Sequence, residues 1–287
     1  MNRLDQSVDA LARACPPLGR LARRLVERER RRRYWRYRTA LTVACPDNAF
    51  LPRAPGAGQI ADGCQTMHNG LRVHYGSYHY FPEQMHAILR ANRGVHEPQE
   101  ERAFAEVLPH VAPGGAILEL GACWAFYSLW FVTRVPDGKA FLIEADPNCL
   151  VQGERNFELN GKTAHRTHAW VGAHSGRAPN GDPLVCIDDF AVTHQLDRIA
   201  ILHSDIQGAE LDMLKGAERT LRAGRVDYLF ISTHGDDLHD ACAKFLEERG
   251  YTVIASANVS QSYSADGVLV AKRATLPAPG FIPLARR

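Results

Sequence analysis

Long apolar segments are missing from this sequence of 287 residues. No run approaches the roughly 18 uninterrupted apolar residues that a membrane-spanning helix requires. Residues 1–20 carry aspartate and arginine side chains where a secretory signal needs an apolar core. The sequence therefore predicts neither a transmembrane helix nor export by a signal peptide, and we expect a cytoplasmic protein that is free or peripheral to a membrane.

Paired cysteines are also missing. The seven cysteines are widely spaced and none belongs to a CxxC pair. This pattern is typical of a reduced chain and predicts neither a disulfide framework nor a zinc ribbon. Hydrophobic residues make up 45% of the chain and charged residues 23%, which excludes a wholly disordered or fibrous protein.

Charge is distributed unevenly along the chain. The net charge is +2, yet residues 20–38 hold ten arginines against Glu27 and Glu29, a local charge of +8 that leaves −6 for the remainder. Four apolar side chains in this region follow helical spacing, namely Leu18, Leu21, Leu25 and Val26. Residues 18–43 are therefore predicted to form a basic, partly amphipathic helix. Its partner is left open between an anionic membrane surface, a second subunit and solvent alone.

Strand and helix patterns alternate from residue 96 onward. The predicted strands are 116–120, 140–144, 165–171, 183–187, 199–203 and 226–233, and one of the predicted helices between them is 208–222. Strands separated by helices require crossovers and predict an α/β, mostly parallel sheet covered on both faces. The last two strands, 251–256 and 267–271, are joined without a helical segment and are expected to form an antiparallel hairpin. Before the sheet, residues 45–65 are predicted as loop and residues 69–80 as a hairpin.

The turn after the first of these strands carries a single glycine, Gly121. A dinucleotide fold needs further glycines near Cys123 and Phe126, so that the backbone can approach a pyrophosphate. S-adenosylmethionine has no phosphate, and one glycine with an acidic residue for its amino group, Glu119, suffices. Glu144 lies 23 residues beyond Gly121, where a carboxylate can accept hydrogen bonds from ribose hydroxyls. The turn therefore favours S-adenosylmethionine over NAD.

Two later strands end in side chains suited to catalysis, Asp205 and His234. Methyl transfer to a hydroxyl requires that the hydroxyl lose its proton, and a histidine or carboxylate can accept it. Alternatively, Asp205 and His234, with Asp236 or Glu210, could hold a divalent cation such as Mg²⁺ that lowers the pKa of the hydroxyl. Both mechanisms remain open, and His203 is a third candidate catalytic residue.

Several motifs together resemble the FkbM-like S-adenosylmethionine-dependent methyltransferases. They are NGLRVHYG (69–76), GVHEPQEERAF (94–104), ILELGACWAFYSL (117–129), IEADP (143–147), NFELNG (156–161), IDDF (187–190) and DIQGAELDMLKGA (205–217). The resemblance spans roughly residues 65–272. It implies a class I methyltransferase (Rossmann-like) sheet of seven strands and O-methylation, often of a hydroxyl on a saccharide or natural product. It also places the segment of Glu97 over the cofactor cleft, and Glu97 and Ser128 join the candidate donor contacts.

The chain departs from the family's usual motifs at two places. In the first turn, Cys123 and Ala125 stand where the family more often has Asn and Gly, while Glu119 keeps the acidic charge. In the fourth-strand motif, His203 and Gln207 replace a Lys and a Glu. These replacements are consistent with a lost ion pair or an altered acceptor site. The resemblance therefore supports the identity of the methyl donor more strongly than the identity of the acceptor.

The predicted organisation has four regions: a basic helical extension with a loop (1–65), a cleft-covering hairpin and helix (66–112), the methyltransferase domain (113–273) and a tail (274–287). The predicted substrate is a small molecule or glycan. Nucleic acid is not expected, because Asp-Ile-Gln-Gly (205–208) stands where a base-flipping enzyme has Asn-Pro-Pro-Tyr. The alternative is a non-catalytic anion-binding or scaffold protein with a degenerate donor pocket.

Overall fold

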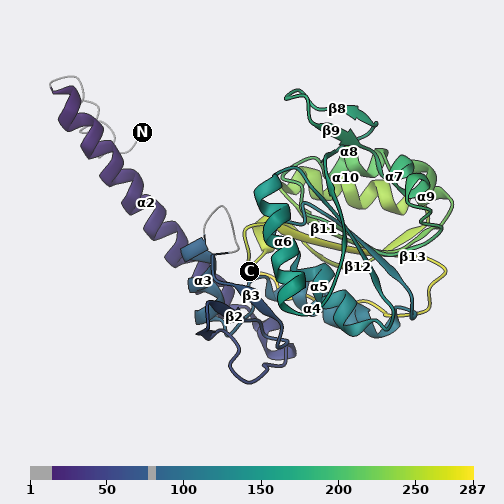
Figure 1. The fold of residues 1–287 in the computed structure, drawn as a ribbon, viewed down its shortest axis with the longest axis horizontal. Helices are drawn as coiled ribbons and strands as arrows, with labels where there is room; N and C mark the ends of the chain where they lie inside the picture. Colours follow the sequence, from purple (N-terminus) through teal and green to yellow (C-terminus); the bar gives the residue numbers. More distant parts are fainter. Residues whose placement is uncertain (1–14, 77–81) are drawn as a thin grey trace.

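A seven-stranded sheet forms the centre of the molecule in the computed structural model, which describes residues 15–76 and 82–287 (Figure 1). Its strand order is β12-β13-β11-β10-β4-β5-β6. The strand β13 runs in the direction opposite to that of the other six. The strands are β4 (Ala116–Leu120), β5 (Lys139–Glu144), β6 (His165–His168), β10 (Ile199–Ser204), β11 (Val226–Thr233), β12 (Tyr251–Ala257) and β13 (Gly267–Arg273). The predicted fold class and the C-terminal antiparallel hairpin are confirmed.

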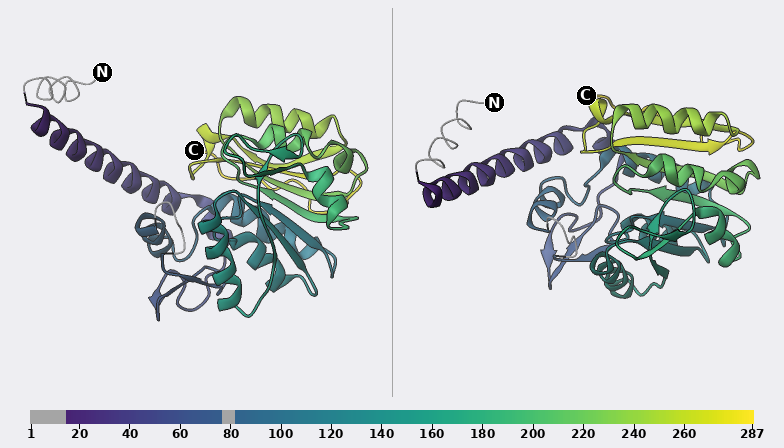
Figure 2. Two further views of the ribbon diagram at one scale, coloured as in Figure 1. Left: turned by 45° about the horizontal axis from the view of Figure 1, so that its top comes forward. Right: turned by 90° about the horizontal axis from the view of Figure 1, so that it is seen from above.

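Helices cover both faces of this sheet (Figures 1 and 2). On one face lie α4 (Pro98–Val107), α5 (Phe126–Arg134) and α6 (Pro147–Leu159), and on the other α7 (Ile187–Thr193), α8 (Glu210–Lys215), α9 (Glu218–Arg222) and α10 (Asp236–Glu247). Successive strand residues point to opposite faces, so Ile117 belongs to the core under α4 and α5, and Leu118 to the core under α7 to α10. This two-sided burial explains why four of the five residues of β4 are apolar, with Glu119 as the exception.

Helix α2 (Pro16–Ala44) extends away from the body of the molecule (Figures 1 and 2). Two prolines occupy its first turn, where the missing N–H groups cost no hydrogen bond, and its 29 residues make it about 43 Å long. Its second half packs beside α3 (Pro82–Ala91), and Trp35 and Thr42 are buried there. The helix predicted over residues 18–43 is confirmed. The observed helix begins two residues earlier and ends one residue later.

Two small sheets lie outside the main one. The first is built from β1 (Ile60–Ala61), β2 (Cys64–Thr66) and β3 (Arg72–His74), and it follows the 3-10 turn η1 (Pro46–Phe50). The segment predicted as loop therefore contains short strands. The predicted hairpin turns at Asn69-Gly70, but its last residues lie outside the described part of the chain. The second sheet joins β7 (Trp170–Val171), β8 (Gly176–Arg177) and β9 (Pro183–Val185), so the strand predicted over 183–187 does not enter the main sheet.

The single helix predicted over 208–222 is wrong, because the chain forms α8 and α9 with a break at Gly216. The carbonyl of Gly216 accepts a hydrogen bond from the N–H of Asp188 at 2.9 Å. The carboxylate of Asp188 in turn accepts from the N–H groups of Arg219 and Thr220 at 2.9 and 2.8 Å, which caps the start of α9. A distant side chain thus starts a new helix where local propensity favours a continuous one.

Within residues 15–76 and 82–287, no helix combines the length and the apolar character needed to cross a bilayer. All seven cysteines are free thiols.

Candidate active site

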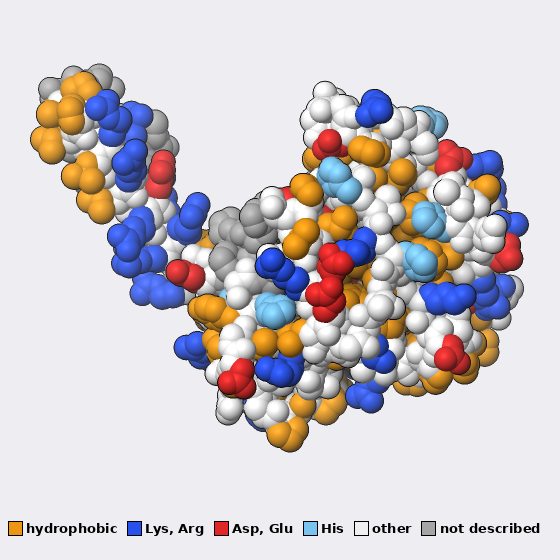
Figure 3. All heavy atoms as spheres, viewed as in Figure 1, with side chains coloured by type: hydrophobic (Ala, Val, Ile, Leu, Met, Phe, Trp, Pro, Cys, Tyr) orange, Lys and Arg blue, Asp and Glu red, His pale blue; other side chains and the backbone are white. Residues whose placement is uncertain are grey.

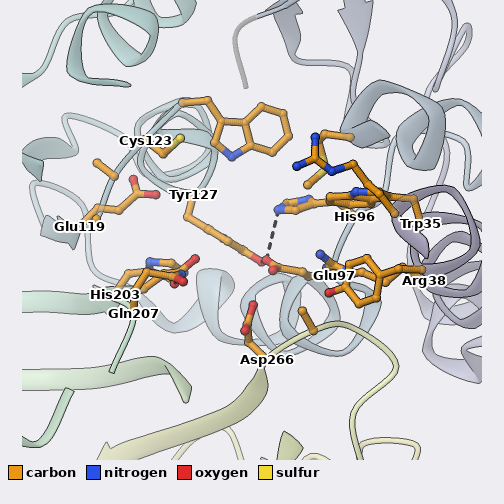
Figure 4. Close-up of a pocket in the computed structure, with 18 residues that line it drawn as sticks. Trp35, Arg38, His96, Glu97, Glu119, Cys123, Tyr127, His203, Gln207 and Asp266 are labelled. Atoms are coloured by element: carbon orange, nitrogen blue, oxygen red, sulfur yellow. Dashed lines mark hydrogen bonds and ion pairs between the residues drawn. The ribbon is translucent and has the colours of Figure 1, made fainter. Parts of the chain in front are cut away.

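A pocket lies where the direction of the sheet connections reverses. The chain runs from β4 outward to β5 and β6, and from β10 outward to β11 on the other side. In open α/β sheets, ligands bind beyond the carboxyl ends of the strands at this point. The pocket has a volume of about 570 Å³, within the range of small-molecule sites. Its walls come from the ends of β4 and β10, the starts of α4 and α5, the connection before β13, and α2 (Figure 4).

The turn after β4 is shaped by its contact with the turn after β10. Gly121 has a φ of +68°, and a Cβ at this position would lie 1.9 Å from the carbonyl oxygen of Asp205. The glycine is therefore required for the two turns to approach each other. Glu144 stabilises the same turn, since its carboxylate accepts hydrogen bonds from the N–H groups of Cys123 (2.9 Å) and Asp146 (2.8 Å). Gly121 lines the pocket, whereas Glu144 is not among the residues that line it.

Glu119, at the end of β4, contributes a carboxylate to the pocket. One of its oxygens accepts a hydrogen bond from the N–H of Ser128 at 2.8 Å. Burial raises the pKa of Glu119, against the opposing charge of His203. Ser128 is itself fully buried and does not line the pocket, so its role in this structure is to hold the Glu119 side chain in place.

Two histidines and two glutamates form a buried ionic wall at the start of α4. His96 lies 3.1 Å from Glu97 and 2.7 Å from Glu101, and His68 lies 3.1 Å from the other oxygen of Glu101. Burial would lower the pKa of His96, but the two carboxylates outweigh it and raise this pKa to about 10. Glu97 also accepts a hydrogen bond from the hydroxyl of Tyr127 at 3.1 Å. The carboxylate of Glu97, which lines the pocket, is therefore fixed in position by His96 and Tyr127.

His203 is engaged by a buried carboxylate that sequence reasoning did not identify. Its Nε2 lies 2.9 Å from Glu100, and its ring packs against Tyr127 with centroids 4.3 Å apart. Burial lowers the pKa of His203, but Glu100 and Glu119 more than compensate and raise it. Burial also raises the pKa of Glu100, so the two side chains share a proton more readily than either would alone. A raised pKa makes His203 less suited to accept a further proton, and in this structure its contact is with Glu100.

Asp205 and His234 lie together, as expected of side chains at the ends of two adjacent parallel strands. The Nε2 atom of His234 is 3.3 Å from Asp205 and 3.4 Å from Asp266, and its Nδ1 atom is 2.9 Å from the buried carboxylate of Glu210. Burial opposes the charged imidazole, but these carboxylates raise the pKa of His234 to about 10. At neutral pH the ring is therefore an imidazolium surrounded by three acidic groups.

Asp266 is an acidic pocket residue whose pKa lies close to neutral pH. It comes from the connection between β12 and β13 and lines the pocket beside Asp205. Burial and the charges of Asp205 and Glu97 raise its pKa to about 7, although His234 acts in the opposite direction. A carboxyl group with this pKa exchanges its proton readily at neutral pH.

Residues 181–253 match the family model described as the Methyltransferase FkbM domain. This part of the chain is therefore similar to FkbM methyltransferase domains. An inferred methyltransferase of Jannaschia sp. (strain CCS1) is 32% identical over 102 residues, a match that covers 33% of this chain and 35% of that relative. The chain thus spans about a third of the length of the relative that it matches.

Several solved methyltransferases resemble this chain at low sequence identity. The ribosomal protein L11 methylase of Lactobacillus delbrueckii subsp. bulgaricus is 11% identical with a TM-score of 0.42, over 63% of this chain and 80% of that one. TrmK of M. capricolum, in complex with S-adenosyl-homocysteine, is 11% identical with a TM-score of 0.40, over 60% and 67%. The matched FkbM range contains β10 and β11, and with them Asp205 and His234; Glu119 and Gly121 lie outside it.

Metal binding by Asp205 and His234 was the second role predicted for this pair. Among the residues that the structure describes, no group of three or more His, Cys, Asp and Glu side chains is arranged to hold a metal ion. The imidazolium form of His234 also has no lone pair to offer a cation. The pair is better suited to proton transfer and charge stabilisation.

Several pocket residues were not predicted, among them Trp35, Arg38, Tyr127 and Asp266. Figure 4 shows Trp35 and Arg38 on the side of the pocket opposite Glu119, with Asp266 between the two sides. The guanidinium of Arg38 lies over the Trp35 ring at 5.1 Å. The sequence signal for Trp35 and Arg38 was an aromatic side chain within the arginine run. For Asp266, the signal was an Asp-Gly pair before the last strand.

Proposed function

We propose that this chain transfers a methyl group from S-adenosylmethionine to a hydroxyl, with a saccharide or a glycosylated metabolite as the acceptor class. The observation that carries the proposal is the placement of acidic side chains beyond the strand ends. Four acidic residues line the pocket, namely Glu97, Glu119, Asp205 and Asp266, and Arg38 lies on the side opposite Glu119 (Figure 4). Acidic groups beside the turn after β4 attract the sulfonium and ammonium groups of a donor, whereas they repel a diphosphate at that turn.

The single glycine of the pocket points to the same donor. Gly121 is the only glycine that lines the pocket among the described residues. The space that a side chain of Gly121 would fill is occupied by the backbone of Asp205. The turn therefore has no further glycine at which its backbone could approach a pyrophosphate. Glu119 and Gly121 would hold the donor, with Glu97 as a further contact and Glu144 supporting the turn. Trp124 lines the pocket without filling it.

The bound donor would supply an electrophilic methyl group. The acceptor oxygen forms a bond to the methyl carbon as the carbon–sulfur bond breaks, and the hydroxyl proton must leave. Asp266 is the base best matched to neutral pH, because its pKa is about 7. Asp205 is the second carboxylate within the pocket. His234, with a pKa of about 10, carries a positive charge beside both acids.

The test is transfer of a labelled methyl group from S-adenosylmethionine to candidate saccharides, followed by mass spectrometry, with and without a chelator. We expect turnover that a chelator leaves unchanged. Asp266→Asn and Asp205→Asn should each lower kcat by about 10²- to 10⁴-fold. Asp237→Asn, an exposed acid at the start of α10, is the matched control and should keep full activity.

The pH profile distinguishes the base. For the wild-type chain, kcat should rise with pH up to about 7, as Asp266 loses its proton, and the Asp266→Asn variant should lack this limb. Failure of S-adenosylmethionine and S-adenosylhomocysteine to bind in calorimetry would exclude the donor. Donor binding without any transfer, unaffected by either substitution, would favour the non-catalytic scaffold.

A further inference from the structure

The first turns of α2 carry an exposed apolar stripe. Leu18, Leu21 and Leu25 have relative exposures of 52%, 54% and 56%. At 3.6 residues per turn, the three side chains lie within an arc of about 60°. Figure 3 shows apolar side chains gathered along one edge of the projecting helix near its free end. We call residues 16–28 the outer segment of α2.

Arginines occupy the other side of the outer segment. Arg20, Arg23 and Arg24 are exposed, and the helical spacing places them away from the leucine stripe. Figure 3 shows the basic side chains along the edge opposite the apolar one. A helix with an apolar face and an arginine-rich face is suited to lie in the interface of a lipid bilayer.

Apolar exposure is concentrated on this helix. Of the twelve large apolar side chains that are exposed among the described residues, six belong to α2. The other six are spread over the body, namely Phe50, Tyr75, Val151, Trp170, Val192 and Phe281. Scattered single side chains are normal for a protein surface, but an unbroken stripe indicates an interaction site. Figures 1 and 2 show that the outer segment projects from the body, so the stripe is accessible.

We propose that the outer segment of α2 docks on an anionic lipid surface, with its leucines in the interface and its arginines at the headgroups. Charge decides against pairing with the same helix of a second copy, because residues 20–38 carry +8 in each chain. The exposed large apolar side chains on the described residues of the body come from six different segments of the chain, which favours a lipid surface over the body of a second copy as the partner of the stripe. Nucleic acid would satisfy the arginines but would leave the leucines in water.

The proposal is tested by sedimentation of the full chain with vesicles of phosphatidylcholine, alone or mixed with phosphatidylglycerol. We expect binding to the anionic vesicles at least about tenfold tighter than to the neutral ones, and loss of that preference at roughly 1 M salt. The triple variant Arg20→Gln, Arg23→Gln, Arg24→Gln should weaken binding to anionic vesicles by about a hundredfold. Leu18→Ser, Leu21→Ser, Leu25→Ser should weaken it by at least about tenfold.

The matched control removes apolar side chains that are exposed elsewhere. Val192→Ser with Phe281→Ser should leave vesicle binding unchanged, since both positions lie on the body. Circular dichroism should show the same helix content in all variants, because none of the replaced side chains is buried. Equal binding of the wild type to neutral and anionic vesicles, or no binding at all, would overturn the proposal. So would a wild-type dimer that the leucine variant converts to monomer, or tight binding to duplex DNA that the leucine variant retains.

Discussion

At the scale of single residues, Gly121 shows how one position connects two parts of the site. The glycine was predicted for its role towards the donor, yet its closest neighbour is the carbonyl oxygen of Asp205 in the next turn. Any side chain here must push β4 and β10 apart at their carboxyl ends. The same close approach fixes the distance between Glu119, which faces the donor, and Asp205, which faces the acceptor in the proposed reaction.

Gly121→Ala should destabilise the protein by about 3 kcal/mol, because it adds a steric clash to a strained backbone conformation. Gly161→Ala is the control: Gly161 has a similar φ of +64°, but a Cβ there would meet no atom within 4 Å. It should cost only about 1 kcal/mol. Urea denaturation measures both, and equal losses would show that the contact with Asp205 contributes nothing.

At the scale of elements, buried glutamates at the start of helix α4 pair with histidines. Glu101 contacts His96, and Glu100 contacts His203 on β10. His96 has a pKa of about 10 in the folded protein, above its unfolded value of about 6.5. The ion pairs with Glu97 and Glu101 therefore stabilise the fold fully below about pH 6.5, and this contribution is lost as the pH rises towards 10.

His96→Ala should cost about 3 kcal/mol near pH 6, since it leaves buried carboxylates without their partner. The difference from the wild type should shrink as the pH is raised towards 10. The control is His110→Ala, an exposed residue after α4, which should change the free energy of unfolding little at any pH. Denaturation curves at several pH values measure the effect, and a constant difference across this range would contradict the assignment.

The elements themselves were largely predictable, whereas contacts between distant ones were not. Helix α2, the strands of the sheet and the meeting of Asp205 with His234 follow from local patterns and from the geometry of parallel strands. The break between α8 and α9 depends on Asp188, about 30 residues away. Trp35 and Arg38 reach the pocket across more than 80 positions of sequence from Glu119. Periodicity gives the faces of a helix but not the partner that each face meets.

At the scale of the whole molecule, the described part of the chain holds α2 through its second half, while its first turns project from the body (Figures 1 and 2). Trp35 is 8% exposed and is the largest buried side chain of the helix. Trp35→Ala should accelerate amide hydrogen exchange in residues 31–44 by at least about tenfold, while the amides of β4 and β10 keep their protection. The control is Tyr37→Ala, because Tyr37 is mostly exposed. Faster exchange in the central strands of the Trp35 variant would show that α2 is part of the central folding unit.

Helix α2 also contains no glycine or proline between residues 20 and 44. Such a helix bends only gently and has no hinge, so its first turns and the wall that it gives to the pocket are parts of one rigid rod. A surface that binds the first turns of α2 is therefore rigidly coupled to Trp35 and Arg38 in the pocket wall, roughly 20 Å away along the helix.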